Sequence, residues 1–212
     1  MNKNEEQRGE QHSLHSSALH SSPSLRVFFA IRLPAEIRAR AEEHMADLRS
    51  LMPDVRAGWE RGEKLHITMK FLGNVEQPRV AALGDAATRA AQSVSAFGLR
   101  IEGAGSFPPR GPARVLWLGV ADDSGALARL HRRLEEECEG MGFAREARPF
   151  HPHITLARLR RPAGAQRLAA LHREKGFASS EVAVAHLVLM RSELGPGGSR
   201  YTVLSSHPLS GE

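Results

Sequence analysis

One short pattern occurs twice in this chain and limits what the chain can fold into. Leu65–Gly73 reads LHITMKFLG and Phe150–Arg158 reads FHPHITLAR, so each stretch contains His-Ile-Thr followed by a large apolar residue. Side chains of a β-strand point alternately to its two faces, so the histidine and threonine of each copy share one face. The repeat therefore predicts two similar half-domains, each presenting a His-x-Thr face to a shared cleft.

The side chains on these faces suit acid–base chemistry at phosphorus. A single histidine on a strand is more often structural, but imidazole has a reference pKa of about 6.5, so a pair can supply one base and one acid near neutral pH. His66 and His153 thus fit an in-line displacement, in which attacking water loses a proton and the leaving oxygen gains one. Thr68 and Thr155 fit donors to the non-bridging oxygens, where charge develops. Such a site needs no metal ion and no cofactor.

The composition favours a compact protein with an anionic partner. The 212 residues are 41% hydrophobic and 25% charged, enough for one domain or two small lobes sharing a core. The net charge is +5, and arginine matches phosphate oxygens, so RNA is a fitting partner. No run approaches the ~20 apolar residues of a membrane span, and no secretory signal is recognisable. With a single cysteine, Cys138, we expect a cytoplasmic protein, and by default a monomer.

Residues 1–24 differ in character from the rest of the chain. They are polar and lack a periodic apolar face, so we expect a disordered tail there and a folded domain over 25–212. Three histidines of the tail, at positions 12, 15 and 20, give a weaker alternative, in which the tail chelates a metal.

Strand and helix patterns alternate along 25–212. Strands are predicted at 25–33, at the two motifs, and at 97–101, 114–120, 182–191 and 200–206. Helices are predicted after Pro34, after Pro78, after Ser124 as N-cap, and over 166–175, with a loop over 103–112 and a hairpin turn at 195–198. Cys138 falls on an apolar helical stripe, so a buried thiol is favoured over a nucleophile. Short turns between neighbouring strands predict an α+β fold with antiparallel sheets.

With their flanks, the two motifs resemble the 2H phosphoesterase superfamily. Within it, the chain is similar to the RNA 2′,3′-cyclic phosphodiesterases, also described as 2′-5′ RNA ligases (LigT-like). Besides both motifs, the stretches that carry this resemblance are 27–30 (VFFA), 114–119 (RVLWLG) and 191–201 (RSELGPGGSRY). The resemblance implies a bilobal fold, with two antiparallel sheets facing a central cleft and helices outside. It also implies metal-independent opening of a 2′,3′-cyclic phosphate on RNA to a 2′-phosphate, with 2′-5′ ligation as the reverse reaction.

Roles for individual residues follow from the same resemblance. It implies that His66 is the proton donor to the leaving 3′ oxygen and that His153 is the proton acceptor that activates water. Thr68 and Thr155 would hold the phosphate, and Arg158 would contact it. Ideal strand alternation places Arg158 on the face opposite His153, so a strand end or a bulge must redirect its side chain.

Two further residues are candidates for substrate binding. Phe150 fits a ring that stacks on a base, and it fits a core aromatic equally well. Lys70 shares a face with His66 and Thr68, so it fits a contact to RNA phosphate. A solvated lysine at a strand end is the alternative.

Two competing functions remain open from the sequence. His151-Pro152-His153 has the form of a metal-binding His-x-His pair, which would make the protein a metallohydrolase. The upstream copy has only His66, however, and no carboxylates cluster beside either motif. The second alternative is a non-catalytic RNA-end-binding module. The substrate, whether a tRNA fragment, another RNA or a nucleotide, is not identified by the sequence.

Overall fold

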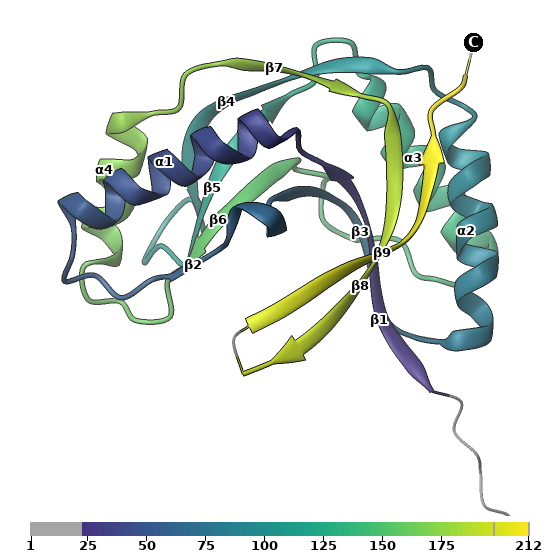
Figure 1. The fold of residues 1–212 in the computed structure, drawn as a ribbon, viewed down its shortest axis with the longest axis horizontal. Helices are drawn as coiled ribbons and strands as arrows, with labels where there is room; N and C mark the ends of the chain where they lie inside the picture. The colour runs from purple at the N-terminus through teal and green to yellow at the C-terminus, as the bar shows by residue number, and fades with distance from the viewer. Residues whose placement is uncertain (1–22, 197, 212) are drawn as a thin grey trace, which may run out of the picture.

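The computed structural model describes residues 23–196 and 198–211 (Figure 1). The predicted tail over 1–24 lies almost wholly outside the described residues, and the first described strand begins at Ser24. Within the described ranges, no helix combines the length and the apolar character needed to cross a membrane.

The described chain alternates strands and helices. The strands are β1 (Ser24–Arg32), β2 (Gly58–Trp59), β3 (His66–Glu76), β4 (Phe97–Phe107), β5 (Val115–Ala121), β6 (His153–Arg158), β7 (Ser180–Val184), β8 (His186–Gly195) and β9 (Gly198–Pro208). The helices are α1 (Ala35–Leu51), α2 (Gln77–Ala91), α3 (Ala126–Gly140) and α4 (Ala165–Lys175), with a 3-10 turn η1 (Gly62–Lys64).

The strands form two antiparallel halves that meet at the two motif strands. The order across the sheet is β7-β4-β5-β6-β3-β1-β8-β9, and β2 pairs with β6. The halves β7-β4-β5-β6 and β3-β1-β8-β9 join where Ile67 of β3 pairs with Ile154 of β6. The predicted α+β fold with two antiparallel sheets is thus confirmed, and the sheets are the halves of one curled sheet (Figure 1).

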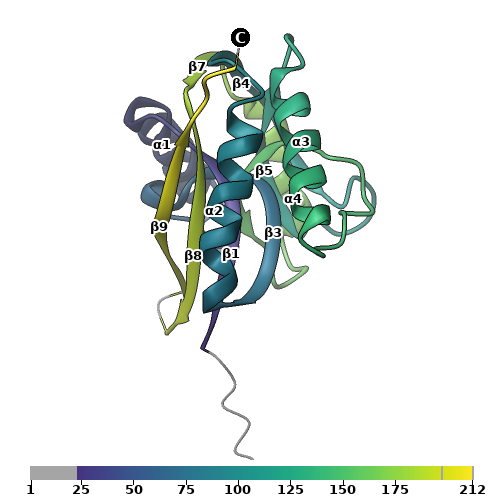
Figure 2. The same cartoon turned by 90° about the vertical axis from the view of Figure 1, so that its right-hand side faces the viewer.

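Helices cover the outside of this sheet and bury the core beneath them. α2 and α3 lie side by side against the β3-β1-β8-β9 half, whereas α1 and α4 pack together over the other half (Figures 1 and 2). Most of the stripe predicted for α3 is fully buried, namely Leu127, Leu130, Leu134 and Cys138, whereas its last member, Met141, follows the helix and is half-buried. The predicted buried thiol is thus confirmed, and burial raises the pKa of Cys138 to about 11.

The loop predicted over 103–112 begins too early, because β4 continues to Phe107. Gly103 adopts a positive φ of 75° at a register shift against β5, so it accommodates a bulge and does not end the strand. Gly105 leaves room for the indole of Trp117, which lies where a Cβ would be. Both glycines therefore belong to the strand.

The single strand predicted over 182–191 is wrong, because two strands occupy this region. β7 pairs with β4 in one half, and β8 pairs with β1 and β9 in the other. Ala185 separates them, and its carbonyl accepts a hydrogen bond from the N–H of Leu209 at 2.9 Å. The chain crosses between the two halves here without a turn signal in the sequence.

Ser124 is not the N-cap of α3. That position is occupied by Gly125, which has a φ of 67°. Ser124 Oγ still accepts a hydrogen bond from the N–H of Ala126 at 3.2 Å, and Asp122 Oδ2 accepts one from Ala128 at 2.9 Å. Side chains preceding the helix thus satisfy first-turn N–H groups from outside the cap position.

Candidate active site

All the site residues predicted from the sequence line one cleft. Because β3 and β6 are neighbours, their His-x-Thr faces open into a common cavity of about 1030 Å³. Its lining includes both motif histidines and both motif threonines, together with Lys70, Phe150 and Arg158. The structure therefore brings the predicted residues together, and their chemical roles remain predictions.

Both histidines are held in the same way by the backbone. His66 Nδ1 lies 2.6 Å from the carbonyl oxygen of Lys64, and His153 Nδ1 lies 2.7 Å from that of His151. A carbonyl only accepts, so each Nδ1–H donates and each Nε2 is left for chemistry. Thr68 Oγ1 is 3.1 Å from His66 Nε2. In both copies Nε2 is therefore the nitrogen that we predict to take part in proton transfer.

Aromatic rings fix the two imidazole planes from behind. The His66 ring lies 5.0 Å from Phe28 and 5.3 Å from Tyr201, measured between ring centroids. The His153 ring lies 5.1 Å from Phe107 in an edge-to-face contact. Packing of this kind restricts ring rotation and adds to the carbonyl hydrogen bonds.

Burial lowers the pKa of both catalytic histidines. For His66 the loss of solvent is the largest cause, the bond to Lys64 opposes it, and the charges of His153 and Arg158 add to it. For His153 burial again dominates, the bond to His151 opposes it, and His151 and Arg158 lower the pKa further. In the free protein both imidazoles therefore favour the neutral form near neutral pH.

Arg158 reaches the cleft because β6 is irregular at its end. The pairing of β6 with β5 shifts register after Thr155, so Leu156 and Ala157 are both fully buried in succession. Arg158 follows as the last residue of the strand and lines the cleft, with its side chain 56% exposed. The prediction that a strand end or bulge redirects Arg158 is confirmed. Its Nε lies 3.9 Å from Glu60 Oε1.

Lys70 has a structural role that the sequence did not indicate. Its Nζ donates to both carboxylate oxygens of Glu135, at 2.9 and 2.8 Å, and to the carbonyl of Ala144 at 2.9 Å. The side chain is only 4% exposed, so the solvated alternative is wrong. All three ammonium donors are used within the protein, which leaves none for an RNA phosphate. Lys70 instead ties β3 to α3 and to the loop that leads into β6.

Phe150 is both a partly buried core aromatic and a residue of the cleft lining. Its ring stacks on His131 at 3.8 Å with an interplanar angle of 10°, and it packs against the core. It also lines the cleft. Stacking of a base on Phe150 stays a prediction, with His131 already occupying one face of the ring.

Several cleft residues were not found from the sequence. Tyr201, Glu60 and Phe107 come from three separate elements or loops, and Phe71 lines the cleft with 63% of its surface exposed. Tyr201 lies in a stretch that resembles the family, and Phe71 lies in the first motif. Neither position has a local pattern that assigns a role, because the contacts are made by strands distant in sequence.

The His151-Pro152-His153 stretch does not form a chelating pair in this structure. The two rings are 6.3 Å apart, and His153 Nδ1 is hydrogen-bonded to the carbonyl of His151. Over 23–196 and 198–211, no three or more His, Cys, Asp or Glu side chains gather as metal ligands.

Comparison with known proteins agrees with this geometry. The family model of the 2′-5′ RNA ligase superfamily matches residues 33–196. The chain belongs to the 2′-5′ RNA ligase superfamily. Within that superfamily, it is 36% identical to an RNA 2′,3′-cyclic phosphodiesterase of Thermus thermophilus, over 89% of this chain and 92% of the relative. It is 35% identical to the Escherichia coli RNA 2′,3′-cyclic phosphodiesterase, over 87% and 97%. A Geobacillus stearothermophilus relative of the same name is longer, and this chain spans 57% of it at 33% identity.

Solved structures of superfamily members share the fold. A protein of Thermus thermophilus superimposes with a TM-score of 0.73 at 29% identity, covering 89% of this chain and all of that one. Escherichia coli LigT in complex with 3′-AMP gives a TM-score of 0.68 at 31% identity, over 89% and 99%. LigT has also been crystallised with ATP and with NADP+.

Proposed function

We propose that this protein hydrolyses RNA 2′,3′-cyclic phosphate ends to 2′-phosphomonoesters, and that the same site joins RNA ends through a 2′-5′ linkage when a 5′-hydroxyl takes the place of water. The observation that carries the proposal is the matched pair of histidines, each with Nδ1 fixed by a carbonyl and Nε2 left for chemistry in one cleft. Relatives named RNA 2′,3′-cyclic phosphodiesterase, at 35% and 36% identity over most of their length, support it.

The two Nε2 atoms take opposite roles in the reaction. Neutral His153 accepts a proton from water as the water oxygen bonds to phosphorus. The bond between phosphorus and O3′ breaks, and the proton on His66 Nε2 passes to O3′. The 2′-phosphate remains, His153 is left protonated and His66 neutral, and exchange with solvent restores the starting state.

Ligation follows the same steps with the 5′-hydroxyl of a second RNA in place of water. His153 accepts the hydroxyl proton as O5′ bonds to phosphorus, and O3′ leaves with the proton of His66, so a 2′-5′ phosphodiester forms. Cleavage of that linkage back to the cyclic phosphate is the reverse reaction, in which the two roles exchange.

Hydroxyl and guanidinium groups stabilise the charge that develops on phosphorus. Thr68 and Thr155 flank the histidines on the same faces and donate hydrogen bonds to the non-bridging oxygens. Arg158 contributes a permanent positive charge at the end of β6. The bound phosphate anion also favours the imidazolium form of His66, so binding reverses the effect of burial and loads the proton donor.

The rest of the proposal concerns the substrate and its setting. The substrate is an RNA carrying a 2′,3′-cyclic phosphate, from a nucleotide to a tRNA fragment, with its base against Phe150. The protein acts as a cytoplasmic monomer without a metal or organic cofactor. The complexes of LigT with 3′-AMP and with ATP support a nucleotide-sized ligand.

The test uses an RNA oligomer ending in a 2′,3′-cyclic phosphate, incubated in EDTA, with identification of the product end group. Wild type should yield the 2′-phosphate, and His66→Ala and His153→Ala should each lose about 10²-fold or more. His186→Ala, which removes an exposed histidine outside the cleft, is the matched control and should retain activity. End-dependent binding without turnover would support the binding module instead. Activity only with added metal would support the metallohydrolase.

A further inference from the structure

A second, much smaller hollow, of about 10 Å³, adjoins the cleft on the His66 side. Three cationic residues line it, namely Arg32, Arg38 and Lys64, and we call these the basic hollow. Lys64 and His66 line both the cleft and the hollow, so the two are neighbours that share part of their lining. Arg32 is the ladder partner of His66 in the pairing of β1 with β3, which places both on the same face of the sheet.

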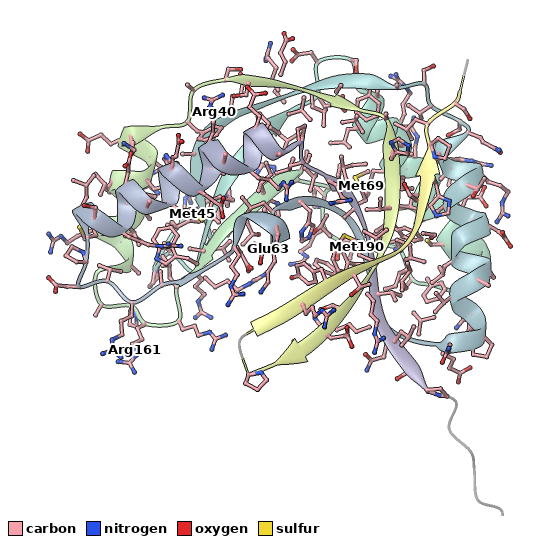
Figure 3. The ribbon with its side chains drawn as sticks, in the orientation of Figure 1. Arg40, Met45, Glu63, Met69, Arg161 and Met190 are labelled. Atoms are coloured by element: carbon pink, nitrogen blue, oxygen red, sulfur yellow. The ribbon has the colours of Figure 1, made fainter. Side chains whose placement is uncertain are left out.

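The charges of the basic hollow are not neutralised by neighbouring carboxylates. Among the described residues, neither arginine nor Lys64 takes part in an ion pair within 4.0 Å. Arg38 Nε is buried and has no hydrogen-bond partner. Glu63, labelled in Figure 3, is the single carboxylate in the lining. The local charge is therefore positive beside the proton donor, as an anionic ligand requires.

The hollow has room for about one water molecule, so an anion bound by these cations lies at its mouth. We propose that the three cations of the basic hollow bind there the 5′-phosphate of the nucleotide that carries the cyclic phosphate. The inference rests on the proposed function. A 2′,3′-cyclic phosphate terminates the RNA at its 3′ end, so every other phosphate of that strand lies on the 5′ side. The nearest one is attached to O5′ of the same nucleotide. An anion site adjoining the catalytic centre thus selects nucleotides with a 5′-phosphate or an RNA continuing in that direction.

The test compares two small substrates that differ in one group. Both are nucleoside 2′,3′-cyclic phosphates, one with a 5′-hydroxyl and one with a 5′-phosphate. Wild type should show a kcat/KM about tenfold higher for the 5′-phosphate compound, the size of one charge-assisted contact. Arg38→Gln and Arg32→Gln should each lower this ratio at least about threefold, and Arg38→Lys should retain part of it.

Two further variants complete the experiment. One is a matched control, and the other should change the ratio of the two kcat/KM values in the opposite direction. Arg161→Gln removes an exposed arginine that lies away from both hollows (Figure 3) and should leave the ratio at its wild-type value. Glu63→Gln removes the competing carboxylate and should raise the ratio. For a dinucleotide substrate, loss of one phosphate contact should also reduce the dependence of log kcat/KM on log salt by about 0.7.

The outcomes separate this proposal from the proposed function. A wild-type ratio near one, or a ratio that Arg32→Gln and Arg38→Gln leave unchanged, would overturn phosphate binding at the basic hollow. It would leave the proposed cyclic phosphodiesterase activity unaffected. Turnover of neither compound nor of the RNA oligomer would overturn the proposed function itself. Arg32 is exposed at the end of β1, so its variant remains informative if Arg38→Gln proves unstable on thermal melting.

Discussion

The two halves of the sheet carry the same His-x-Thr motif in different surroundings. His66 is the more enclosed histidine, with Phe28 and Tyr201 against its ring and Thr68 at its Nε2. His153 packs against Phe107 and next to a second histidine, His151. The backbone bond to Nδ1 is the same in both. The backbone thus orients the two imidazole rings in the same way, whereas the rings differ in how far they are shielded from solvent.

The cation that follows each motif differs even more. Lys70 follows Thr68 by two residues and is buried in an ion pair with Glu135. Arg158 follows Thr155 by three residues, beyond a bulge, and is mostly exposed to the cleft. Both strands shift register just after the threonine, so in each copy the third residue after it faces the cleft. That residue is Phe71 in β3 and Arg158 in β6, whereas Lys70 is turned toward the core. A repeated motif fixes the positions of the chemical groups, and the local strand geometry decides what the neighbouring residues do.

The largest effect is expected from combining the two histidine variants. His66→Ala and His153→Ala should each lower kcat by about 10²-fold or more, and the double variant should lose little beyond the worse single one. The reason is that proton donation and proton acceptance serve one displacement. Single-turnover rates with a cyclic-phosphate oligomer measure this. Losses that multiply in the double variant would mean that the two halves act independently.

The threonines should show a smaller effect and reveal the asymmetry. Thr68→Val and Thr155→Val should each lower kcat by roughly 10- to 10²-fold, because a donor to the developing charge is lost. Only Thr68→Val removes a partner of a histidine Nε2, so only it should also shift the pH profile. The serine variants, which keep the hydroxyl, should retain most activity. Equal pH profiles for the two valine variants would contradict the asymmetry.

Methionine variants of Lys70 and Arg158 should separate stability from catalysis. Lys70→Met removes the ammonium from the buried Glu135, which then keeps only the N–H of Glu146 at 3.3 Å and His131 Nε2 at 3.7 Å. The free energy of unfolding should therefore fall by about 3–5 kcal/mol. Replacing both partners, as in Lys70→Met with Glu135→Leu, should recover much of that stability. Arg158→Met should leave the melting temperature near the wild-type value and lower kcat/KM about tenfold. Denaturant unfolding and initial rates on the same samples test the contrast, and destabilisation by Arg158→Met would contradict it.

The smallest of the expected effects is a difference between the pH profiles of kcat/KM and kcat. Burial lowers the pKa of both catalytic histidines, so in the free protein the proton is held only at pH values below the reference of about 6.5. The bell-shaped profile of kcat/KM should therefore centre below that pH. In the complex the phosphate anion favours imidazolium, so the profile of kcat should lie at higher pH. A kcat profile at lower pH than that of kcat/KM would show that binding does not load the donor.

Much of the catalytic centre could be predicted because it is encoded locally. Strand alternation is enough to place His66 with Thr68 and His153 with Thr155, and repetition is enough to place the two pairs in one cleft. A strand end or bulge before Arg158 could be predicted as well, because its side chain needs one to reach the face of His153. Such inferences need no knowledge of how distant strands pair.

The remaining site residues depend on partners that are distant in the chain. The prediction that Lys70 shares a face with His66 and Thr68 is wrong, because the pairing of β3 with β1 shifts register between Thr68 and Lys70. The shift turns Lys70 toward the helix-covered core, where Glu135 of α3 lies against it. Tyr201 reaches His66 only because β8 and β9 fold back beside β1. The extension of β4 to Phe107 depends on a bulge at Gly103, a residue that more often marks a turn. In each of these cases the position of the side chain or the end of the strand depends on contacts with elements distant in sequence.

The most direct test of the account asks which histidine protonates the leaving group. The substrate is a ribonucleotide with sulfur in place of O3′ in the cyclic ring, because a thiolate leaves without a proton far more readily than an alkoxide. His66→Ala should recover at least about tenfold relative to its rate on the oxygen substrate, and His153→Ala should recover nothing. Recovery of His153→Ala instead would reverse the assignment of the two halves, and recovery of neither would contradict general acid catalysis by His66.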